Sequence, residues 1–373
     1  MIKSFFLFLF LLPFTCLAQY VITGKVINSA DKTPVANASV FLNNAAVGTK
    51  TDEHGAFTLT GVRQGQYDLV VSILSFEPSH QNIIVNNDIK LPVIELVPKV
   101  MMLQEVRIKP KTNWAKDYEK FKRLFFGNSD FASKCKIVNK GLPDILNLDY
   151  DPEAGVFTAS SNDYLEIENK ALGYRIRYLL AKLVSDQRTG INYYEGTSAF
   201  EDLKGSESQM RKWKKNRLAA YEGSSMHFLR STVSNTITHE GFKVLRLISK
   251  SGSANKNSIS HSFRTLVSIP LNDSDFVRQT DVKGEYALTF KDNLYVMYNK
   301  KRSHLGNTPT AEWASSKQWD DALITTLIFN EPYSFFDNNG IIINPTSVIF
   351  DGNWGQRLVA DLLPVDYVPA LDN

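Results

Sequence analysis

The sequence predicts an all-β sandwich at its front and an α+β unit behind it, and three observations carry this prediction. In residues 20–98, short strand-like runs alternate with Gly, Pro, Asn and Asp turns, as is typical of a sandwich. From residue 113 onward, two stretches with apolar residues at helical spacing lie among further strand-like runs. The 373 residues, 43% of them hydrophobic, suffice for two or three packed domains. We therefore expect a linker at 99–112 and, at 113–373, a mainly antiparallel sheet with one or two covering helices.

The first 18 residues have the layout of a signal peptide. Lys3 supplies a positive start, and the apolar run from Phe5 to Leu12 is shorter than a membrane span. Small residues end at Ala18, where a signal peptidase would cut. A lipoprotein with Cys16 as the lipidated residue is the alternative, but the residues before Cys16 match such a site poorly. We expect an exported protein with no transmembrane span after cleavage.

Cleavage would leave Cys135 as the single cysteine. One thiol cannot form an internal disulfide or a cysteine-based metal site, so the fold must rest on burial. We expect Cys135 to be a small buried side chain and not a nucleophile, and we expect no cofactor.

Two half-buried strands of the sandwich flank a tight turn at Asp52 to Gly55, where Gly55 is free to adopt a positive φ angle. The chain contains no His-Glu-x-x-His motif, and its six histidines show no metal-ligand spacing, so His54 is expected to be a solvated turn residue. Alternation predicts inward-facing side chains at Val40, Leu42, Phe57, Leu59, Tyr67, Leu69 and Val71.

The order of the front motifs resembles a known accessory domain. The motifs are Ile22–Ile27, Thr33–Val40, Thr51–Phe57 and Gly61–Tyr67. Together they resemble the carboxypeptidase-regulatory-like (transthyretin-like) domain found at the front of many Bacteroidetes envelope proteins. The resemblance implies a transthyretin- or immunoglobulin-like sandwich, a place in the periplasm or at the outer-membrane periphery, and no peptidase activity.

Two further resemblances concern the rest of the chain. Asn169–Tyr174, Ala220–Ser224 and Trp354–Pro364 look like parts of Bacteroidetes proteins named only for that front domain, which implies an architecture and no activity. Leu103–Ile108 resembles the start of the plug of TonB-dependent outer-membrane transporters. A barrel of about 22 strands, each of about 9–11 residues, does not fit into the remaining chain, so this identity is excluded.

The basic, proline-marked stretch Lys109-Pro110-Lys111 predicts a boundary between two independent domains. A sandwich of this size can fold alone if its two sheets bury their alternating faces. We therefore expect protease to cut near Lys109 or Lys111 and to release two stable fragments.

Helical spacing predicts one helix at Trp114–Phe126, capped by Asn113 and ended by Gly127. A second helix is predicted at 208–237, with a break or bend at Gly223-Ser224-Ser225. Strands are expected at 164–167, 175–180, 286–290 and 294–298, the last two joined as a hairpin through Lys291-Asp292-Asn293.

The second helix carries the candidate binding residues of the chain. Arg211, Lys212, Lys214, Lys215 and Arg217 are five cations in seven residues, with Trp213 among them. One interpretation is an anion-contact face for lipid A or phospholipid headgroups, where cations neutralise phosphates and Trp favours an interface. The other is a solvated helix face whose charges pair with Glu201-Asp202 and Glu207.

Catalytic constellations are weak. His227 lies near Ser224-Ser225, but no Gly-x-Ser-x-Gly elbow exists, so a core or boundary histidine is expected. Asp361, Asp366 and Arg357 could form a carboxylate pair with a partner cation, but their setting predicts a terminal segment docked on the sheet.

The sequence therefore favours a non-enzymatic envelope protein whose sandwich is a docking or spacing module for another envelope protein. The net charge of +3 does not call for nucleic acid, which an exported protein would rarely meet. A glycan-binding protein is the alternative, and it would need an exposed aromatic platform, for which Tyr193-Tyr194 or Trp313 with Trp319 are candidates. A hydrolase of unrecognised type is a third alternative, and it would need a deep cleft.

Overall fold

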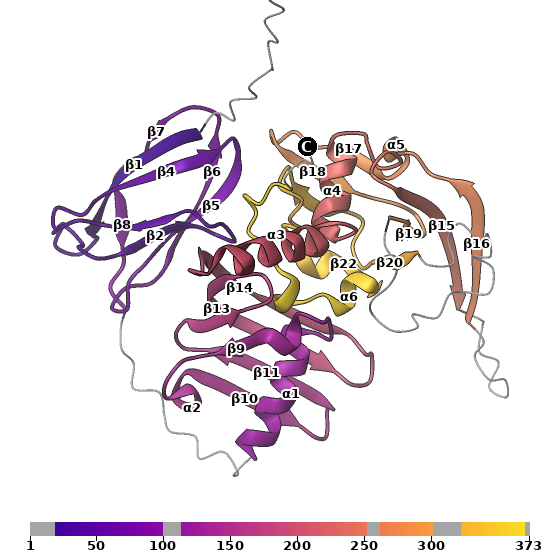
Figure 1. Cartoon of the computed structure of the whole chain (residues 1–373), viewed down its shortest axis with the longest axis horizontal. Coiled ribbons are helices and arrows are strands. Elements are labelled where there is room, and N and C mark those ends of the chain that lie inside the picture. Colours follow the sequence, from indigo (N-terminus) through magenta and orange to yellow (C-terminus); the bar gives the residue numbers. More distant parts are fainter. Residues whose placement is uncertain (1–18, 100–112, 252–261, 301–321, 370–373) are drawn as a thin grey trace, which may run out of the picture.

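The computed structural model describes residues 19–99, 113–251, 262–300 and 322–369 (Figure 1). The signal peptide, the linker from residue 100 onward, and Trp313 and Trp319 lie outside the described residues. The described chain forms a β-sandwich followed by antiparallel sheets with a few helices, which confirms the predicted fold class. In this part of the chain no helix is both long and apolar enough to cross a bilayer.

The sandwich consists of two four-stranded sheets. The first has the order β4-β1-β7, with β8 also paired to β1, and the second has the order β3-β2-β5-β6. All seven side chains that alternation predicts to face inward are buried, and Gly55 has a φ of 72°. His54 is exposed in its turn, as expected. The strands are β1 Gln19–Asn28, β2 Ser39–Leu42, β3 Gly48–Lys50, β4 Ala56–Arg63, β5 Gly65–Ser72, β6 Ser79–Val85, β7 Ile89–Lys90 and β8 Ile94–Leu96.

A six-stranded antiparallel sheet forms the second unit. Its longest strand, β13, pairs with β11 and β12 along one edge and with β14 along the other. Helix α1 contributes Phe121 and Phe125 to the core of this unit, where the Phe125 ring meets Tyr178. The cap at Asn113 and the end at Gly127 are as predicted. The elements are α1 Trp114–Phe126, η1 Ala132–Lys134, β9 Cys135–Ile137, α2 Leu142–Ile145, β10 Leu146–Asp151, β11 Val156–Ser161, β12 Leu165–Asn169, β13 Tyr174–Asp186 and β14 Asn192–Asp202.

Two further antiparallel sheets form the third unit, in the orders β16-β15-β19-β20-β22 and β17-β18-β21. They share a core in which Phe228 of α4, Phe276 and Phe336 are fully buried. The elements are α3 Glu207–Tyr221, α4 Ser225–Val233, β15 Phe242–Ser251, β16 Ser262–Pro270, α5 Asp273–Phe276, β17 Val277–Gln279, β18 Glu285–Leu288, β19 Asn293–Tyr298, β20 Leu323–Phe329, β21 Ser334–Asp337, η2 Pro345–Ser347, β22 Val348–Gly352, α6 Asn353–Gln356 and η3 Val359–Asp361.

The predicted hairpin between β18 and β19 is wrong. The two strands belong to different sheets, because β18 pairs with β17 and β21 while β19 pairs with β15 and β20. In the turn between them, Asp292 accepts a hydrogen bond from Arg246 of β15 at 2.6 Å, which favours the pairing of β19 with β15. The predicted helix at 208–237 is two helices that break at the expected Gly223-Ser224 and end at Val233.

The sandwich is bonded to the rest of the molecule through the loop at residues 43–46, here called the sandwich loop. The Asn44 N–H donates to Ser198 O at 2.7 Å, and the Phe200 N–H donates to Ala45 O at 3.0 Å, so the loop extends the edge of β14. On its other side, the Val365 N–H donates to Asn44 O at 2.6 Å. Val365 is itself part of the sandwich core. A residue of the C-terminal segment therefore packs into the sandwich core, and the release of two stable fragments by protease stays a prediction.

Candidate functional site

Helix α3 is anchored to the turn between β12 and β13 by its inner face. Trp213 Nε1 donates to Lys170 O at 3.1 Å, Asn216 Nδ2 to Ala171 O at 2.7 Å, and Arg217 Nε to Leu172 O at 2.7 Å. Asn216 and Arg217 lie three and four residues after Trp213, so the three donors share one side of the helix. The Trp213 ring fills the space above Gly173, where a Cβ atom would lie 2.2 Å from the ring.

Arg217 does not belong to the predicted anion-contact face. Its guanidinium also donates to Asp202 at 2.6 Å and lies 3.8 Å from the centre of the Tyr174 ring, and its side chain is only 19% exposed. Trp213 is buried as well. These two residues could not be separated from their neighbours by sequence alone, because the inward side of α3 depends on where the turn at residues 170–173 lies.

The other four predicted cations point to solvent. Arg211, Lys212, Lys214 and Lys215 are all exposed. Arg211 makes an exposed ion pair with Glu207 at 3.6 Å, whereas the structure shows no ion pair between the three lysines and any described residue. Arg211 and Arg217 therefore form ion pairs, as the charge-paired interpretation predicted. Lys212, Lys214 and Lys215 are solvated without such a pair among the described residues.

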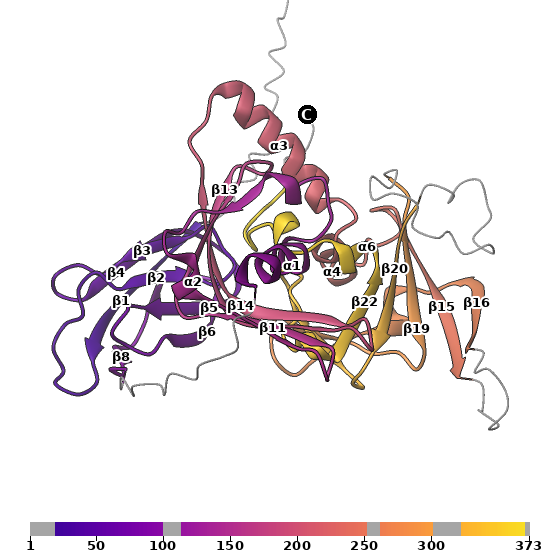
Figure 2. The ribbon, with the colours of Figure 1, turned by 90° about the horizontal axis from the view of Figure 1, so that it is seen from below.

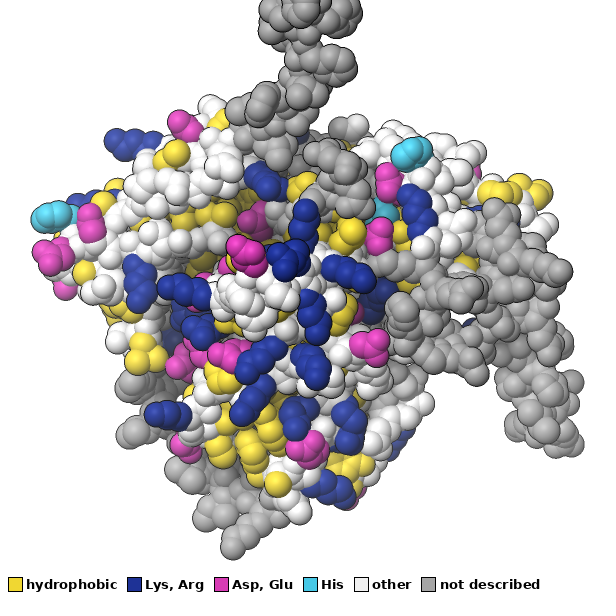
Figure 3. Space-filling model, in the orientation of Figure 1, with side chains coloured by type: hydrophobic (Ala, Val, Ile, Leu, Met, Phe, Trp, Pro, Cys, Tyr) yellow, Lys and Arg dark blue, Asp and Glu magenta, His cyan; other side chains and the backbone are white. Residues whose placement is uncertain are grey.

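Basic side chains continue beyond α3 on the same broad face of the molecule. Figure 3 shows Lys and Arg side chains gathered over α3 and, below it, over α1. Lys116 and Arg123 of α1 are exposed, and so are Lys170 and Lys134, whose backbones are hydrogen-bonded to each other. The sequence analysis missed the α1 cations, since only the three-dimensional fold places α1 and α3 toward the same face of the molecule.

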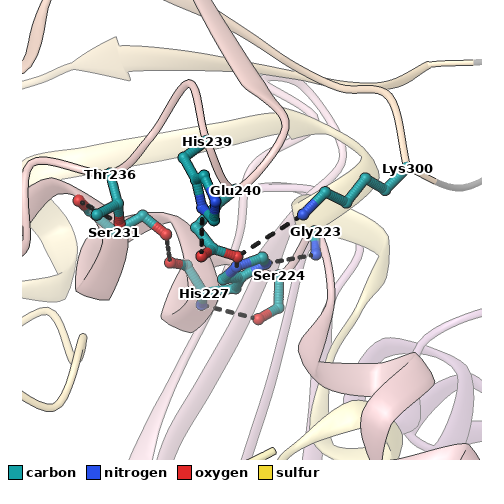
Figure 4. A network of polar contacts seen from close by, with 8 residues as sticks. All are labelled: Gly223, Ser224, His227, Ser231, Thr236, His239, Glu240 and Lys300. Atoms are coloured by element: carbon teal, nitrogen blue, oxygen red, sulfur yellow. Dashed lines mark hydrogen bonds and ion pairs between the residues drawn. The ribbon is translucent and has the colours of Figure 1, made fainter. Parts of the chain in front are cut away.

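His227 lies in a buried polar network (Figure 4). Its Nδ1 accepts from the Gly223 N–H at 3.1 Å, so Nδ1 carries no proton, and Nε2 then donates to Glu240 Oε2 at 3.1 Å. Burial lowers the pKa of His227, while the hydrogen bond with Glu240 opposes that shift. Lys300 Nζ lies 3.9 Å from the same carboxylate. The network holds a neutral histidine between α4 and the segment that follows it.

No nucleophile is positioned beside His227 in this network. The Ser224 hydroxyl accepts from the His227 backbone N–H at 3.1 Å, which makes it the N-cap of α4. The Ser231 hydroxyl donates to the His227 carbonyl at 2.7 Å, within the same helix. Both hydroxyls serve the helix backbone, so the prediction of a core or boundary histidine is confirmed.

The C-terminal acids and Arg357 are also engaged by the fold. Asp361 accepts a hydrogen bond from Ser129, and burial raises the pKa of its carboxyl to about 6. Arg357 Nη1 donates to Ala220 O at 3.2 Å. Asp366 accepts from the Ala46 N–H at 3.0 Å, in the sandwich loop, so Asp361 and Asp366 serve different contacts and form no catalytic pair. These residues match the predicted docked terminal segment.

Arg230 of α4 is a central residue that the sequence analysis did not find. Its guanidinium donates to Asn339 O at 2.9 Å, to Tyr367 O at 2.8 Å and to Val365 O at 2.7 Å. Asn339 in turn donates to Gln66 O of the sandwich at 2.7 Å. Arg230 therefore holds together the C-terminal segment and the loop before Ile341 where both meet the sandwich. No local sequence pattern predicts hydrogen bonds between residues more than a hundred positions apart in the chain.

The remaining candidates, Cys135 and the Tyr193-Tyr194 pair, have no arrangement that suits catalysis or sugar binding. Burial raises the pKa of the Cys135 thiol to about 12, which keeps it protonated and unreactive as expected. Tyr194 packs edge-on against Phe125 in the core of the second unit, and Tyr193 is half-buried beside Glu195, so the pair is no platform. Across the described ranges, no group of His, Cys, Asp and Glu has the arrangement of a metal site.

A different aromatic pair combines an exposed tyrosine with a half-buried phenylalanine. Tyr333 and Phe335 lie two residues apart at the start of β21, with ring centres 6.1 Å apart and ring planes inclined by 22°. Tyr333 is 50% exposed, and nearby Ile343, whose N–H donates to Phe335 O, is 48% exposed. This pair, and not Tyr193-Tyr194, has the form of the platform that a glycan-binding protein would need.

One pocket lies where the sandwich meets the second unit. It has a volume of about 240 Å³, is open to solvent, and is lined by residues of β2, β3, β13 and β14, among them Phe41 and Arg177. A pocket of this size is below the roughly 300–1,000 Å³ of small-molecule sites. Arg177 is already hydrogen-bonded to Glu166 at 3.2 Å, so the pocket offers no convergent catalytic groups.

Comparison with known families identifies the front of the chain. Residues 22–108 match the model of the CarboxypepD_reg-like domain, which confirms the resemblance drawn from the sandwich motifs and extends past the predicted end of the sandwich at residue 98. A search of curated proteins gives no match.

Solved structures give only weak likenesses. One is a chain of a type II cohesin–X–dockerin complex of Acetivibrio cellulolyticus, at 18% identity over 21% of this chain and 58% of that one, with a TM-score of 0.19. Two are from Bacteroides uniformis. A DUF3823 family protein is 11% identical over 86% of this chain and 99% of its own, with a TM-score of 0.17. A candidate carbohydrate-binding protein is 8% identical over 90% and 99%, with a TM-score of 0.18. Scores this low establish no shared overall fold.

Proposed function

We propose that this chain is a non-enzymatic binding or scaffold protein of the cell envelope, in which the sandwich is a docking or spacing module fixed to the other units. One observation carries the proposal. The residue types that could perform chemistry, such as His227, Asp361 and Ser224, are each engaged in a contact that holds the fold. The exposed surface instead carries unpaired charges and a few apolar side chains, which suit contact with another molecule.

An envelope location is supported by two features of the front of the chain. Residues 1–18 have the layout of an export leader. The CarboxypepD_reg-like domain follows directly, and its motifs resemble those of Bacteroidetes envelope proteins. We therefore place the protein in the periplasm or at the periphery of the outer membrane.

The sandwich can hold a bound partner at a set orientation because it is fixed to the other units and is not joined to them by the linker alone. Its sandwich loop is hydrogen-bonded to β14 on one side and to Val365 on the other. At the same time it exposes apolar side chains, including Ile84 at 43% and Val93 at 52%. A partner bound to the sandwich would thus be held at a set orientation to α1 and α3.

Site-specific photo-crosslinking in the native cell tests this proposal. A photoreactive residue at Ile84 or Val93 should give one discrete adduct with an envelope protein, and the chain should fractionate with the envelope. Ile269 of β16, which is 71% exposed, is the matched control position outside the sandwich. Recovery of the chain in the cytoplasm, or identical adducts from all three positions, would contradict the proposal.

A glycan-binding function is favoured by one specific observation, the Tyr333–Phe335 pair. Aromatic faces stack on the apolar faces of sugar rings, and Asn344, which donates to Tyr333 O at 3.1 Å, supplies a neighbouring amide. A glycan array would test it, because a Tyr333→Ala variant should lose at least tenfold in signal. Equal binding by the variant and the parent would remove this alternative.

A further inference from the structure

We propose that the outer side of α3 is a membrane-contact ridge that binds the phosphodiester headgroups of an anionic phospholipid bilayer. The ridge consists of Arg211, Lys212, Lys214 and Lys215. This inference rests on the proposed envelope location and names one surface that the protein would engage there.

The first support is the position of α3 in the fold. Figure 2 shows α3 standing out from the body of the molecule, on the broad face that Figure 1 presents to the viewer. A planar surface approaching this face would meet α3 before the sheets beneath it. The helix is 15 residues long, which gives a ridge of roughly 22 Å.

The second support is that the fold does not use the ridge cations. Three side chains on the inner side of α3, Trp213, Asn216 and Arg217, already secure the helix to the turn at residues 170–173. The ridge residues are exposed, and the ion pair of Arg211 with Glu207 joins side chains that are 74% and 87% exposed. Such an exposed pair contributes little to stability and opens readily toward a stronger anion.

The third support is charge complementarity to an extended surface. The ridge cations lie within five consecutive residues and point to different sides of the outer half of the helix, so they cannot converge on one phosphate. The polar tips of Lys side chains reach outward on flexible stems, which lets each find its own headgroup on a plane. Met210, which is 51% exposed on the same helix, adds an apolar side chain next to the cations.

The α1 cations form a second, weaker row. Lys116 and Arg123 are exposed, and their helix α1 lies recessed relative to α3 in Figure 2. Attraction across that gap is screened by salt, because the Debye length is about 8 Å at physiological ionic strength. We therefore expect their removal to matter less than removal of the ridge.

Vesicle binding by the full exported protein tests the ridge. The probe is vesicles of phosphatidylcholine and phosphatidylglycerol in a roughly two-to-one ratio. Each charge removed should weaken partitioning about fivefold, so changing all four ridge residues to Gln should reduce it on the order of a few hundredfold. Changing Lys116 and Arg123 to Gln should reduce it less than tenfold. Raised salt should abolish binding of the parent protein.

The matched control changes four exposed lysines of the sandwich, Lys25, Lys50, Lys90 and Lys99, to Gln. It alters the net charge equally, and it should bind as the parent protein does. Equal loss in both quadruple variants would show attraction by net charge alone and overturn the ridge. Binding to pure phosphatidylcholine, or competition by glycerol phosphate at low concentration, would likewise overturn it. If the ridge variant binds vesicles as the parent does while the Ile84 crosslink still forms, the ridge is contradicted and the scaffold function is not. Recovery of the protein in the cytoplasm would contradict both proposals.

Discussion

The outer side of α3 and the junction around Arg230 both carry basic side chains, yet they use them in opposite ways. At the junction, one guanidinium donates to three backbone carbonyls, and those carbonyls belong to segments that touch the sandwich. On α3, three lysines face solvent without an ion pair to any described residue. A cation's role therefore follows from whether backbone carbonyls without another donor lie beside it. Arg217 and Lys214, one turn apart, make the same contrast within a single helix.

The largest expected effect comes from removing Arg230. The Arg230→Met variant keeps the length of the side chain but leaves three carbonyls without their donor. We expect a loss of about 3–5 kcal/mol in the free energy of unfolding, since three hydrogen bonds from a part-buried charged donor are lost together. Urea denaturation measures it. Arg211→Met is the matched control on the ridge and should change stability by less than about 0.5 kcal/mol.

A second large effect is expected at Gly173, beneath α3. This residue has a φ of 73°, and an added Cβ would lie 2.2 Å from the Trp213 ring. Gly173→Ala should therefore destabilise the fold by about 2–4 kcal/mol and displace α3 from its turn. Thermal unfolding measures the first effect, and Trp213 fluorescence measures the second. Gly190→Ala has a similar φ of 71° with open space around it, and should show the backbone penalty alone.

The contrast between inward and outward cations of α3 predicts a smaller pair of effects. Arg217→Gln should cost about 1–3 kcal/mol, because it removes charge-assisted hydrogen bonds to Leu172 O, Gly173 O and Asp202. Lys214→Gln should cost less than about 0.5 kcal/mol. Equal values in chemical denaturation would erase the distinction between the two sides of the helix.

The smallest effect concerns pH. Burial lowers the pKa of His227 in the folded protein, so its contribution to stability is present above the ordinary value of 6.5 and is lost as pH falls below it. The loss can reach about 1.4 kcal/mol per pH unit for this one proton. His227→Gln should therefore flatten the decline of stability between pH 6.5 and more acidic values. Asp361 acts in the opposite sense, because its raised pKa of about 6 makes its contribution fade as pH rises through that value.

Features that depend on nearby residues could be predicted from the sequence. Alternation identified the inward side chains of the sandwich, and capping residues set both ends of α1, because these features depend only on nearby residues. The break before α4 followed from Gly223 and Ser224 for the same reason.

What the sequence could not supply is pairing between distant segments. Whether β18 and β19 form a hairpin depends on Arg246 reaching Asp292, and the fixed position of the sandwich depends on Val365 and Arg230. Five cations were predicted for the contact face. Arg217 differs from the other four because it donates to carbonyls of the turn at residues 170–173, whereas the other four face solvent.

We propose above that the sandwich is fixed to the other units and is not a tethered domain, and cleavage of the linker tests this most directly. A specific protease site inserted between Lys109 and Pro110 allows the chain to be cut there, after which gel filtration in native buffer shows whether the two fragments separate. We predict that the two fragments of the parent protein elute together, and that the two fragments of the Arg230→Met variant separate. Elution of the parent fragments as two stable, independent species would contradict it.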